Sequence, residues 1–416
     1  SVRLKYKLSR VVNHPPLREI ITLRMYSMQL KNPPKAIAID FFCGAGGTTR
    51  GFINSGIYVL AGIDNDSKCQ DTYTCRDNNL NPWTNCPPIF LAKDIARDKF
   101  QVLTDLKKII KTAKNKYPKA PLIFSICAPC QPFTHITKIS LAQKTTARRE
   151  KEKNLLDESL EYIRVLKPDA IFSENVPGIK HTNKAGDLFK LFERNLSKKY
   201  QVKSNVVNAK YFGVPQNRNR TILLAISKKY LKSGTNFTVL KKDPGQKCLV
   251  VVKDVLGTAK KPKFVKIKAG EFAKNDSNHR AANLTPINLK RIKKAVAGKS
   301  NYLLRSLRVQ SHKNKDRAGN QFHHTDVYGR MDPEKVAPTI TTKCYSFTNG
   351  RYGYPYKSQN RAITLREAAV LQSFPKTYKF FPQSQIIQPG KQIGNAVPPK
   401  LSQFFGDYLI SKINND

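Results

Sequence analysis

Short apolar runs alternate with amphipathic segments through the first half of the chain. The runs have the length of buried strands and cover residues 36–41, 58–63, 121–126 and 169–172. Between them, apolar positions recur at helical spacing over residues 102–110, 155–166 and 188–196. Residues 202–208 and 221–226 are expected to pair as strands. This alternation predicts an α/β fold built on a doubly wound, mostly parallel, Rossmann-like sheet.

The pattern weakens after residue 226. Residues 227–325 are rich in Lys, Asn, Ser and Gly and carry only short apolar pieces, which predicts a second, smaller and irregular domain. Periodicity returns in two predicted helices, over 364–372 and 404–413. We expect four parts, namely an N-terminal basic extension (1–35), a main domain (36–226), the irregular domain (227–359) and a hinge and C-terminal segment that returns to the main domain (360–416).

Charge points to the class of partner. The 74 Lys and Arg residues against 29 Asp and Glu give a formal net charge of +45, which favours a polyanion, with nucleic acid first. The eight cysteines do not predict a disulfide scaffold in a chain of 416 residues. Only Cys127 and Cys130 form a C-x-x-C, without a second pair, so we expect no metal. No apolar run approaches the length of a membrane span, so we expect no membrane partner and a cytoplasmic location.

A glycine-rich turn follows the first predicted strand, in the order Phe42-Cys43-Gly44-Ala45-Gly46-Gly47. Such a turn lets the backbone approach a ligand at a helix N-terminus. Asp64, at the end of the second strand, suits the hydroxyls of a ribose, and Asp94, at the end of a third, suits an adenine amino group. The fingerprint of dinucleotide binding is incomplete because Thr49 stands where its third glycine would be. A nicotinamide cofactor, S-adenosylmethionine and tight packing each remain open at this point.

Reactive side chains lie on or just after three other predicted strands. Pro129-Cys130-Gln131 comes after the run 121–126, at the edge where α/β sheets bind ligands. Glu174 ends the strand that begins near residue 169. Arg218 and Arg220 alternate on a strand, so both can face one pocket.

Five motifs together carry a family resemblance. They are Phe42-x-Gly44-x-Gly46-Gly47, Pro129-Cys130-Gln131, Glu174-Asn175-Val176, Gln216-x-Arg218-x-Arg220 and Gly394-Asn395-x-Val397. In order and spacing the chain resembles the DNA (cytosine-5) methyltransferases of the bacterial restriction-modification type, over residues 36–226 and 328–416. One departure is Ala128, where the family usually has a second proline before the Pro-Cys pair.

The resemblance implies catalytic roles. Cys130 would be the nucleophile that attacks carbon 6 of a cytosine flipped out of duplex DNA, with Gln131 beside it. Glu174 would donate to ring nitrogen 3, and Asn175 would hold neighbouring backbone. Of Arg218 and Arg220, one would contact the cytosine carbonyl oxygen and the other orient Glu174 or Cys130. The basic loop 132–154 is expected to be mobile without DNA and to close over it.

The resemblance also implies the cofactor, S-adenosyl-L-methionine, and the partners. The expected cofactor-binding residues are Phe42, Cys43, Gly44, Ala45, Gly46, Gly47, Asp64, Asn65, Asp94, Ile95, Pro129, Asn395, Ala396 and Val397. The partner is double-stranded DNA, and a cognate restriction endonuclease is a functional partner without physical contact. The protein is expected to act as a monomer in the bacterial nucleoid.

The irregular domain, residues 227–359, is expected to recognise the target sequence from the major groove. Candidate base-reading residues are Asn278, His279, Arg280, Asn288, Arg291, Arg305, Arg308, Gln310 and Gln321. By contrast, Arg330 and the stretch 339–342 are expected to shape this domain.

Four other functions compete with DNA methylation. A zinc-dependent cytosine deaminase would need an H-x-E motif that the sequence lacks. A nicotinamide oxidoreductase would leave Cys130, Glu174 and Arg218 without a role. A tRNA cytosine-5 methyltransferase shares the catalytic set and is the nearest rival, although the large basic domain favours DNA. A catalytically silent DNA-binding protein is disfavoured because every catalytic position is filled.

Overall fold

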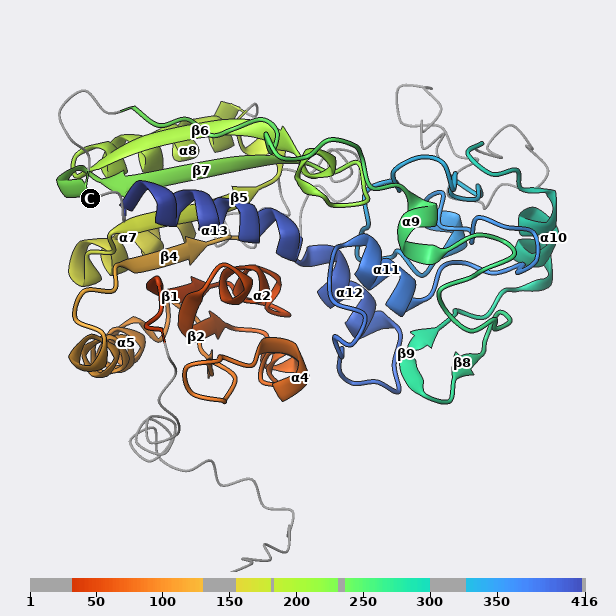
Figure 1. Ribbon diagram of the computed structural model, residues 1–416, viewed down its shortest axis with the longest axis horizontal. Helices are drawn as coiled ribbons and strands as arrows, with labels where there is room; N and C mark the ends of the chain where they lie inside the picture. The colour runs from red at the N-terminus through yellow and green to blue at the C-terminus, as the bar shows by residue number, and fades with distance from the viewer. Residues whose placement is uncertain (1–31, 130–154, 181–182, 231–235, 300–326, 414–416) are drawn as a thin grey trace, which may run out of the picture.

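The computed structural model describes residues 32–129, 155–180, 183–230, 236–299 and 327–413 (Figure 1). Within these residues, seven strands form one sheet in the order β3-β2-β1-β4-β5-β7-β6. The strands are β1 (Ala36–Phe41), β2 (Ile57–Asp64), β3 (Ile89–Ala92), β4 (Leu122–Ile126), β5 (Ala170–Asn175), β6 (Tyr200–Asn208) and β7 (Asn219–Ser227). Neighbours among β1 to β5 pair in parallel, and β7 runs antiparallel to both β5 and β6. The predicted mostly parallel α/β sheet is confirmed.

Helices cover both faces of the sheet. They are α2 (Gly47–Asn54), α3 (Gln70–Tyr73), α4 (Arg76–Asn79), α5 (Lys99–Lys116), α7 (Leu155–Leu166), α8 (Asn183–Ser197) and α13 (Pro399–Ile413). Apolar side chains of α5, α7 and α8 form a core with one face, and those of α2 and α13 form a core with the other. Because both faces are covered, β1, β4 and β5 are buried along their whole length, which explains why each begins with a run of apolar residues on both faces.

A second lobe adjoins the carboxyl ends of the strands (Figure 1). Its described elements are α9 (Val252–Leu256), the hairpin strands β8 (Phe272–Ala273) and β9 (Asp276–Arg280), α10 (Pro286–Lys294), α11 (Leu365–Leu371) and α12 (Ile387–Asn395). One hydrophobic cluster joins α9, α11 and the loops 331–352, and it also contains Ala45 of the glycine-rich turn. From this lobe the chain returns through α13, which lies along the sheet beside α2.

Candidate active site

The glycine-rich turn connects β1 to α2 at the carboxyl edge of the sheet. Phe42, Gly44 and Gly46 have positive φ angles of 59°, 49° and 84°. A side chain at Gly44 would meet no atom within 4 Å, so this face of the turn is open. The N-cap residue of α2, Gly46, has no side chain to cap the helix, and the first turn lacks acidic residues; the buried Asp40 carboxyl interacts with the backbone N–H of Thr49. The N–H groups at this helix end that have no partner within the helix can donate hydrogen bonds to an anionic group of a ligand.

The opposite face of the turn is covered by residues 394–397, which precede the last helix. A Cβ at Gly47 would lie 2.1 Å from the carbonyl oxygen of Val397, which means that only glycine permits this approach. Ala396 and Val397 are buried there, whereas Asn395 at the end of α12 is exposed. The motif Gly394-Asn395-x-Val397 thus packs directly against the first motif, more than three hundred residues earlier in the sequence.

Acidic residues lie at the end of β2 and just after β3, at the same edge of the sheet. Asp64 accepts hydrogen bonds from the backbone N–H of Gly44 and of Asp66, both at 2.9 Å, and burial raises the pKa of its carboxyl. Asn65, next to it, is exposed. β3 ends at Ala92, so Asp94 and Ile95 lie just beyond it in a buried turn, where Asp94 Oδ1 accepts from the N–H groups of Ala96 and Arg97.

The ends of β4 and β5 are tied together by two side chains. Ser173 Oγ donates to the carbonyl oxygen of Ile126 at 2.6 Å, and Asn175 Nδ2 donates to that of Ala128 at 3.1 Å. Pro129 follows and is exposed. Cys130 and Gln131, the loop 132–154, and the extension up to residue 31 lie outside the described residues.

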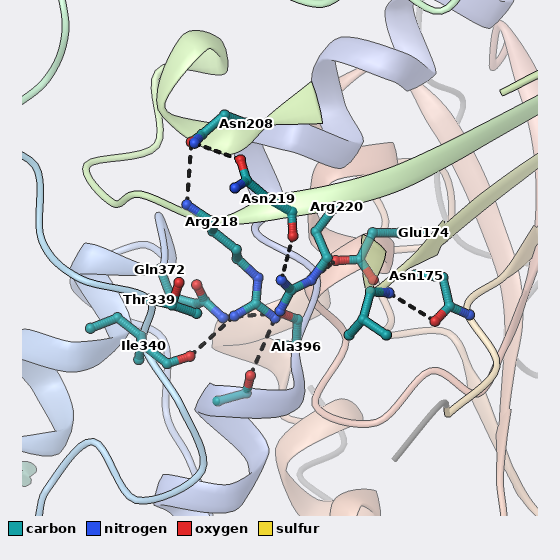
Figure 2. A network of polar contacts seen from close by, with 12 residues as sticks. Glu174, Asn175, Asn208, Arg218, Asn219, Arg220, Thr339, Ile340, Gln372 and Ala396 are labelled. Atoms are coloured by element: carbon teal, nitrogen blue, oxygen red, sulfur yellow. Dashed lines mark hydrogen bonds and ion pairs between the residues drawn. The ribbon is translucent and has the colours of Figure 1, made fainter. Parts of the chain in front are cut away.

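Glu174 faces an arginine from the neighbouring antiparallel strand. Arg220 Nε lies 2.8 Å from Glu174 Oε1, and both side chains are at least 87% buried (Figure 2). Burial lowers the pKa of Arg220, but the carboxylate of Glu174 opposes this shift and favours the charged guanidinium. The ion pair restrains Glu174 at the carboxyl edge of the sheet, next to the backbone that leads to Cys130.

Arg218 has different partners from Arg220. It precedes β7 and donates to three carbonyl oxygens, those of Ile340 at 3.1 Å, Gly394 at 3.3 Å and Ala396 at 3.2 Å (Figure 2). Burial and the nearby charge of Arg220 lower the pKa of Arg218 to about 9, so it stays charged at neutral pH. The two arginines therefore lie together but bind different groups: Arg220 the carboxylate, Arg218 the backbone of the second lobe and the C-terminal segment.

Two glutamines that sequence reasoning did not single out complete this polar network. Gln216 accepts from the N–H of Ile340 at 2.9 Å and donates to Gln372, whose side chain donates in turn to the carbonyl oxygens of Ile393 and Ala396, both at 3.0 Å. In the sequence, Gln216 belongs to the motif that contains the two arginines, and Gln372 ends a predicted helix. A buried glutamine has no periodic signal, because its partners lie far away in the sequence.

Several candidate base-reading residues are structural. Asn278 is fully buried and exchanges hydrogen bonds with the backbone of Phe380, and His279 bonds Thr364 and the carbonyl oxygen of Val265. Arg291 is 4% exposed and lies over the ring of Tyr328. The expectation that these three read bases is wrong for this conformation, because their polar groups point into the protein. Arg280 stacks on Phe272, and Asn288 accepts from Arg291. Arg305, Arg308, Gln310 and Gln321 lie outside the described residues.

Arg330 shapes the second lobe, as its sequence context predicts. Its side chain is fully buried and donates to the carbonyl oxygens of Tyr354, Tyr356, Gln359 and Ile292. Across the described ranges, no group of three or more His, Cys, Asp or Glu side chains is arranged to hold a metal ion. None of the helices formed by those residues combines the length and apolar character that crossing a membrane requires.

Comparison with known proteins identifies the family. The model of the C-5 cytosine-specific DNA methylases matches residues 37–411. The chain is similar to the type II methylase M.HgiDII of Herpetosiphon aurantiacus, at 36% identity over 369 residues that cover 88% of this chain and 92% of the relative. It is also similar to the type II methyltransferase M1.HphI of Haemophilus parahaemolyticus, at 27% identity over 91% of this chain and 87% of the relative.

Solved structures share the fold. A putative DNA modification methyltransferase encoded within an E. coli prophage superposes with a TM-score of 0.58 at 19% identity, over 91% of this chain and 99% of that one. The S. pombe Dnmt2 methyltransferase superposes with a TM-score of 0.55 at 15% identity, over 91% and 99%. With a family match across nearly the whole chain and a relative 36% identical, this protein belongs to the C-5 cytosine-specific DNA methylases, enzymes that methylate carbon 5 of cytosine in DNA.

Proposed function

We propose that this methylase is the modification enzyme of a type II restriction-modification system and transfers the methyl group of S-adenosyl-L-methionine to a cytosine in duplex DNA. Its similarity to type II methylases over most of their length supports the biological role. In this role it protects the host's recognition sites from a cognate endonuclease, which it need not contact. It acts as a monomer in the cytoplasm.

The cofactor would bind at the glycine-rich turn. The open face at Gly44 and the N-terminus of α2, which begins after a glycine and has no acidic residue in its first turn, suit the carboxylate of a methionine moiety. Asp64 suits the ribose, and Asp94 with Ile95 suits the adenine, while Asn395 and Val397 close the site from the other side. When bound, S-adenosylmethionine supplies the methyl group. Phe42, partly exposed at the tip of the turn, would pack against the ligand.

The chemistry assigned to the protein is covalent activation of the base. The Cys130 thiolate bonds to carbon 6 of the cytosine while Glu174 donates to ring nitrogen 3, which makes carbon 5 nucleophilic. After methylation, carbon 5 loses its proton and the bond between Cys130 and carbon 6 breaks. The observation that carries this assignment is the pair Glu174–Arg220 beside Asn175, whose amide holds Ala128 two residues before Cys130.

The division of labour follows the two lobes. We assign residues 36–226 to catalysis and cofactor binding, 227–359 to target recognition, and 360–416 to the return segment. The base must leave the duplex to reach Glu174, at a cost of a few kcal/mol of unstacking. The basic loop 132–154 is suited to cover it.

A trapping experiment tests the covalent step. Duplex DNA with 5-fluorocytosine at the target position cannot lose the substituent at carbon 5, so wild-type enzyme with cofactor should form a complex that survives denaturing electrophoresis. Cys130→Ser should form none, and Cys127→Ser should behave as wild type. Equal trapping by Cys130→Ser would rule out this nucleophile. Transfer of labelled methyl groups to tRNA instead of duplex DNA would favour the rival substrate.

A further inference from the structure

A buried tyrosine of the second lobe holds the glycine-rich turn. The hydroxyl of Tyr378 donates to the carbonyl oxygen of Ala45 at 2.5 Å, across 333 positions of sequence. Asn79 Nδ2 donates to the same hydroxyl at 3.1 Å and to the carbonyl oxygen of Tyr73 at 2.9 Å. Ala45 sits between Gly44 and Gly46, so this contact fixes the centre of the turn.

The same contact leaves no room for a side chain at Gly46. A Cβ at Gly46 would lie 2.9 Å from the Tyr378 hydroxyl and 2.6 Å from Asn79 Nδ2, both closer than a carbon atom normally approaches. The glycine is thus required by its φ of 84° and by the side chains that close over it. The arrangement leaves the Gly44 face open and closes the Gly46 face.

Tyr378 is itself held firmly. Its ring packs against Phe374 and Phe380, with ring centroids 4.6 and 5.2 Å away. Its backbone carbonyl accepts from Arg366, which forms an ion pair of 2.6 Å with Asp276 of β9. The tyrosine therefore connects the hairpin of the second lobe to the turn at the carboxyl edge of the sheet.

We propose that Tyr378 is a positioning residue that fixes the glycine-rich turn in the conformation that binds the cofactor. The proposal rests on the assignment of the cofactor to this turn. Tyr378 itself need not touch the ligand, since it acts through the Ala45 carbonyl and the path of the backbone from Gly44 to Gly47. Its loss should weaken cofactor binding much more than DNA binding or the rate at saturation.

A matched pair of substitutions tests the role. Tyr378→Phe removes the hydroxyl and keeps the aromatic packing. Tyr200→Phe is the control, because the hydroxyl of this buried tyrosine also donates to a backbone carbonyl, that of Pro168 at 2.8 Å, but at the amino end of the sheet. Binding of S-adenosylhomocysteine is measured by calorimetry without DNA, together with thermal unfolding, KM for S-adenosylmethionine and kcat.

We expect Tyr378→Phe to raise the Kd for S-adenosylhomocysteine about three- to tenfold, which is the range for one lost hydrogen bond. The KM for S-adenosylmethionine should rise by a similar factor, whereas kcat should stay within about twofold of the wild-type value. Tyr200→Phe should bind as wild type, even if its melting temperature falls as much. Should Tyr378→Phe fold poorly, Asn79→Ser removes the partner of the hydroxyl and should weaken binding in the same direction.

The failures can be told apart. If Tyr378→Phe and the wild type bound S-adenosylhomocysteine equally well, the positioning role would be refuted and the cofactor assignment would stand. Equal weakening in Tyr200→Phe would mean that general destabilisation explains the effect, and it would also sink this role. A wild type that does not bind S-adenosylhomocysteine would overturn the cofactor assignment and the positioning role with it.

Discussion

Two arginines two positions apart bind different kinds of partner. Arg220 pairs with Glu174 at 2.8 Å, whereas Arg218 binds the carbonyl oxygens of Ile340, Gly394 and Ala396. Both are buried charges, but only Arg220 faces a carboxylate. The alternation of a strand predicts that both point to one side, and it does not predict which groups they meet, because those groups come from distant parts of the chain.

We expect Arg220→Ala to lower kcat about 100-fold, a typical contribution of a positioned acid–base group, because Glu174 would lose the partner that orients it. The Kd for S-adenosylhomocysteine should stay within about twofold, since Arg220 lies at β7 and not at the glycine-rich turn. Single-turnover methylation at saturating DNA and cofactor measures the rate. The exposed Arg164→Ala, which loses an ion pair with Glu161, is the control. A kcat near the wild-type value would show that Glu174 needs no such restraint.

Arg218→Ala should act mainly on stability. Removal of the guanidinium leaves three buried carbonyl oxygens without this donor. Each oxygen that finds no water as a replacement should lower the free energy of unfolding by about 1–3 kcal/mol. Urea unfolding monitored by tryptophan fluorescence and by circular dichroism measures the loss. If the free energy of unfolding matched that of wild type, the assignment of Arg218 as a link between lobes would be wrong.

Asp40 should make the stability of the protein depend on pH. It lies fully buried in β1 and accepts from Thr49 Oγ1 at 2.7 Å, yet burial raises its pKa from 3.8 to about 6. The folded state therefore holds the proton more tightly than the unfolded state. The resulting stabilisation is complete below the unfolded pKa and is lost as pH rises toward 6.

Asp40→Asn should remove this dependence, because its amide oxygen can still accept from Thr49 and carries no charge. Relative to wild type, the variant should gain up to about 3 kcal/mol of unfolding free energy between about pH 4 and pH 7, at 1.36 kcal/mol per pKa unit. Chemical denaturation across this range measures the difference, with the exposed Asp71→Asn as the control substitution. A difference independent of pH would refute the shifted pKa.

At the scale of elements, helix α11 combines a capping box with a buried ion pair. Thr364 Oγ1 accepts from the N–H of Glu367, whose carboxylate accepts from the N–H of Thr364. The same carboxylate receives two hydrogen bonds from Arg361, at 2.7 and 2.8 Å, with both side chains at most 1% exposed. Burial alone would raise the pKa of Glu367, but Arg361 outweighs it and holds the pKa below its ordinary value.

Arg361→Met should destabilise the protein by about 3–5 kcal/mol, because it leaves a carboxylate buried without its partner. The double variant Arg361→Met with Glu367→Leu should recover most of the loss, since neither charge is then buried. In wild type, the contribution of the pair should be present above the unfolded pKa of Glu367 and be lost as pH falls through its depressed folded value. Urea titrations of the three proteins test this, and a double variant no better than Arg361→Met would contradict it.

Sequence predicts some elements better than others for physical reasons. The sequence predicts β1 and α7 with the bounds that the structure has, because a mainly apolar run and an amphipathic repeat are local patterns. Helix α12 was not predicted, since it contains Pro389 and Gly390. Gly390 is needed there because a Cβ would lie 2.6 Å from the ring of Tyr345, a contact that no local pattern encodes.

The same limit applies to the candidate site. Glu174 lies opposite Ile222 on the adjacent strand β7. Arg220 is two positions from Ile222 and points to the same face of the sheet, so the strand register explains the ion pair. The contributions of Gln216, Gln372 and Tyr378 do not follow from the register, because each of these side chains bonds a residue more than a hundred positions away. A single polar residue carries no sequence signal of such a partner. Resemblance to a family locates the motifs, and the structure adds the side chains that hold them.

At the scale of the molecule, charge should govern binding to DNA and leave cofactor binding almost unaffected. The formal net charge is +45, and phosphate contacts by Lys and Arg release counterions, so affinity for duplex DNA should fall about 1,000-fold or more between roughly 50 and 200 mM salt. S-adenosylhomocysteine displaces no such counterion atmosphere, and its Kd should change by less than about twofold over the same range. Fluorescence anisotropy with labelled duplex and calorimetry with S-adenosylhomocysteine give the two slopes on one preparation. A shallow dependence of the DNA affinity on salt would mean that most of the positive charge lies away from the duplex. An equally steep dependence for both ligands would mean that salt perturbs the fold, because only a common structural change weakens the binding of ligands of such different charge together.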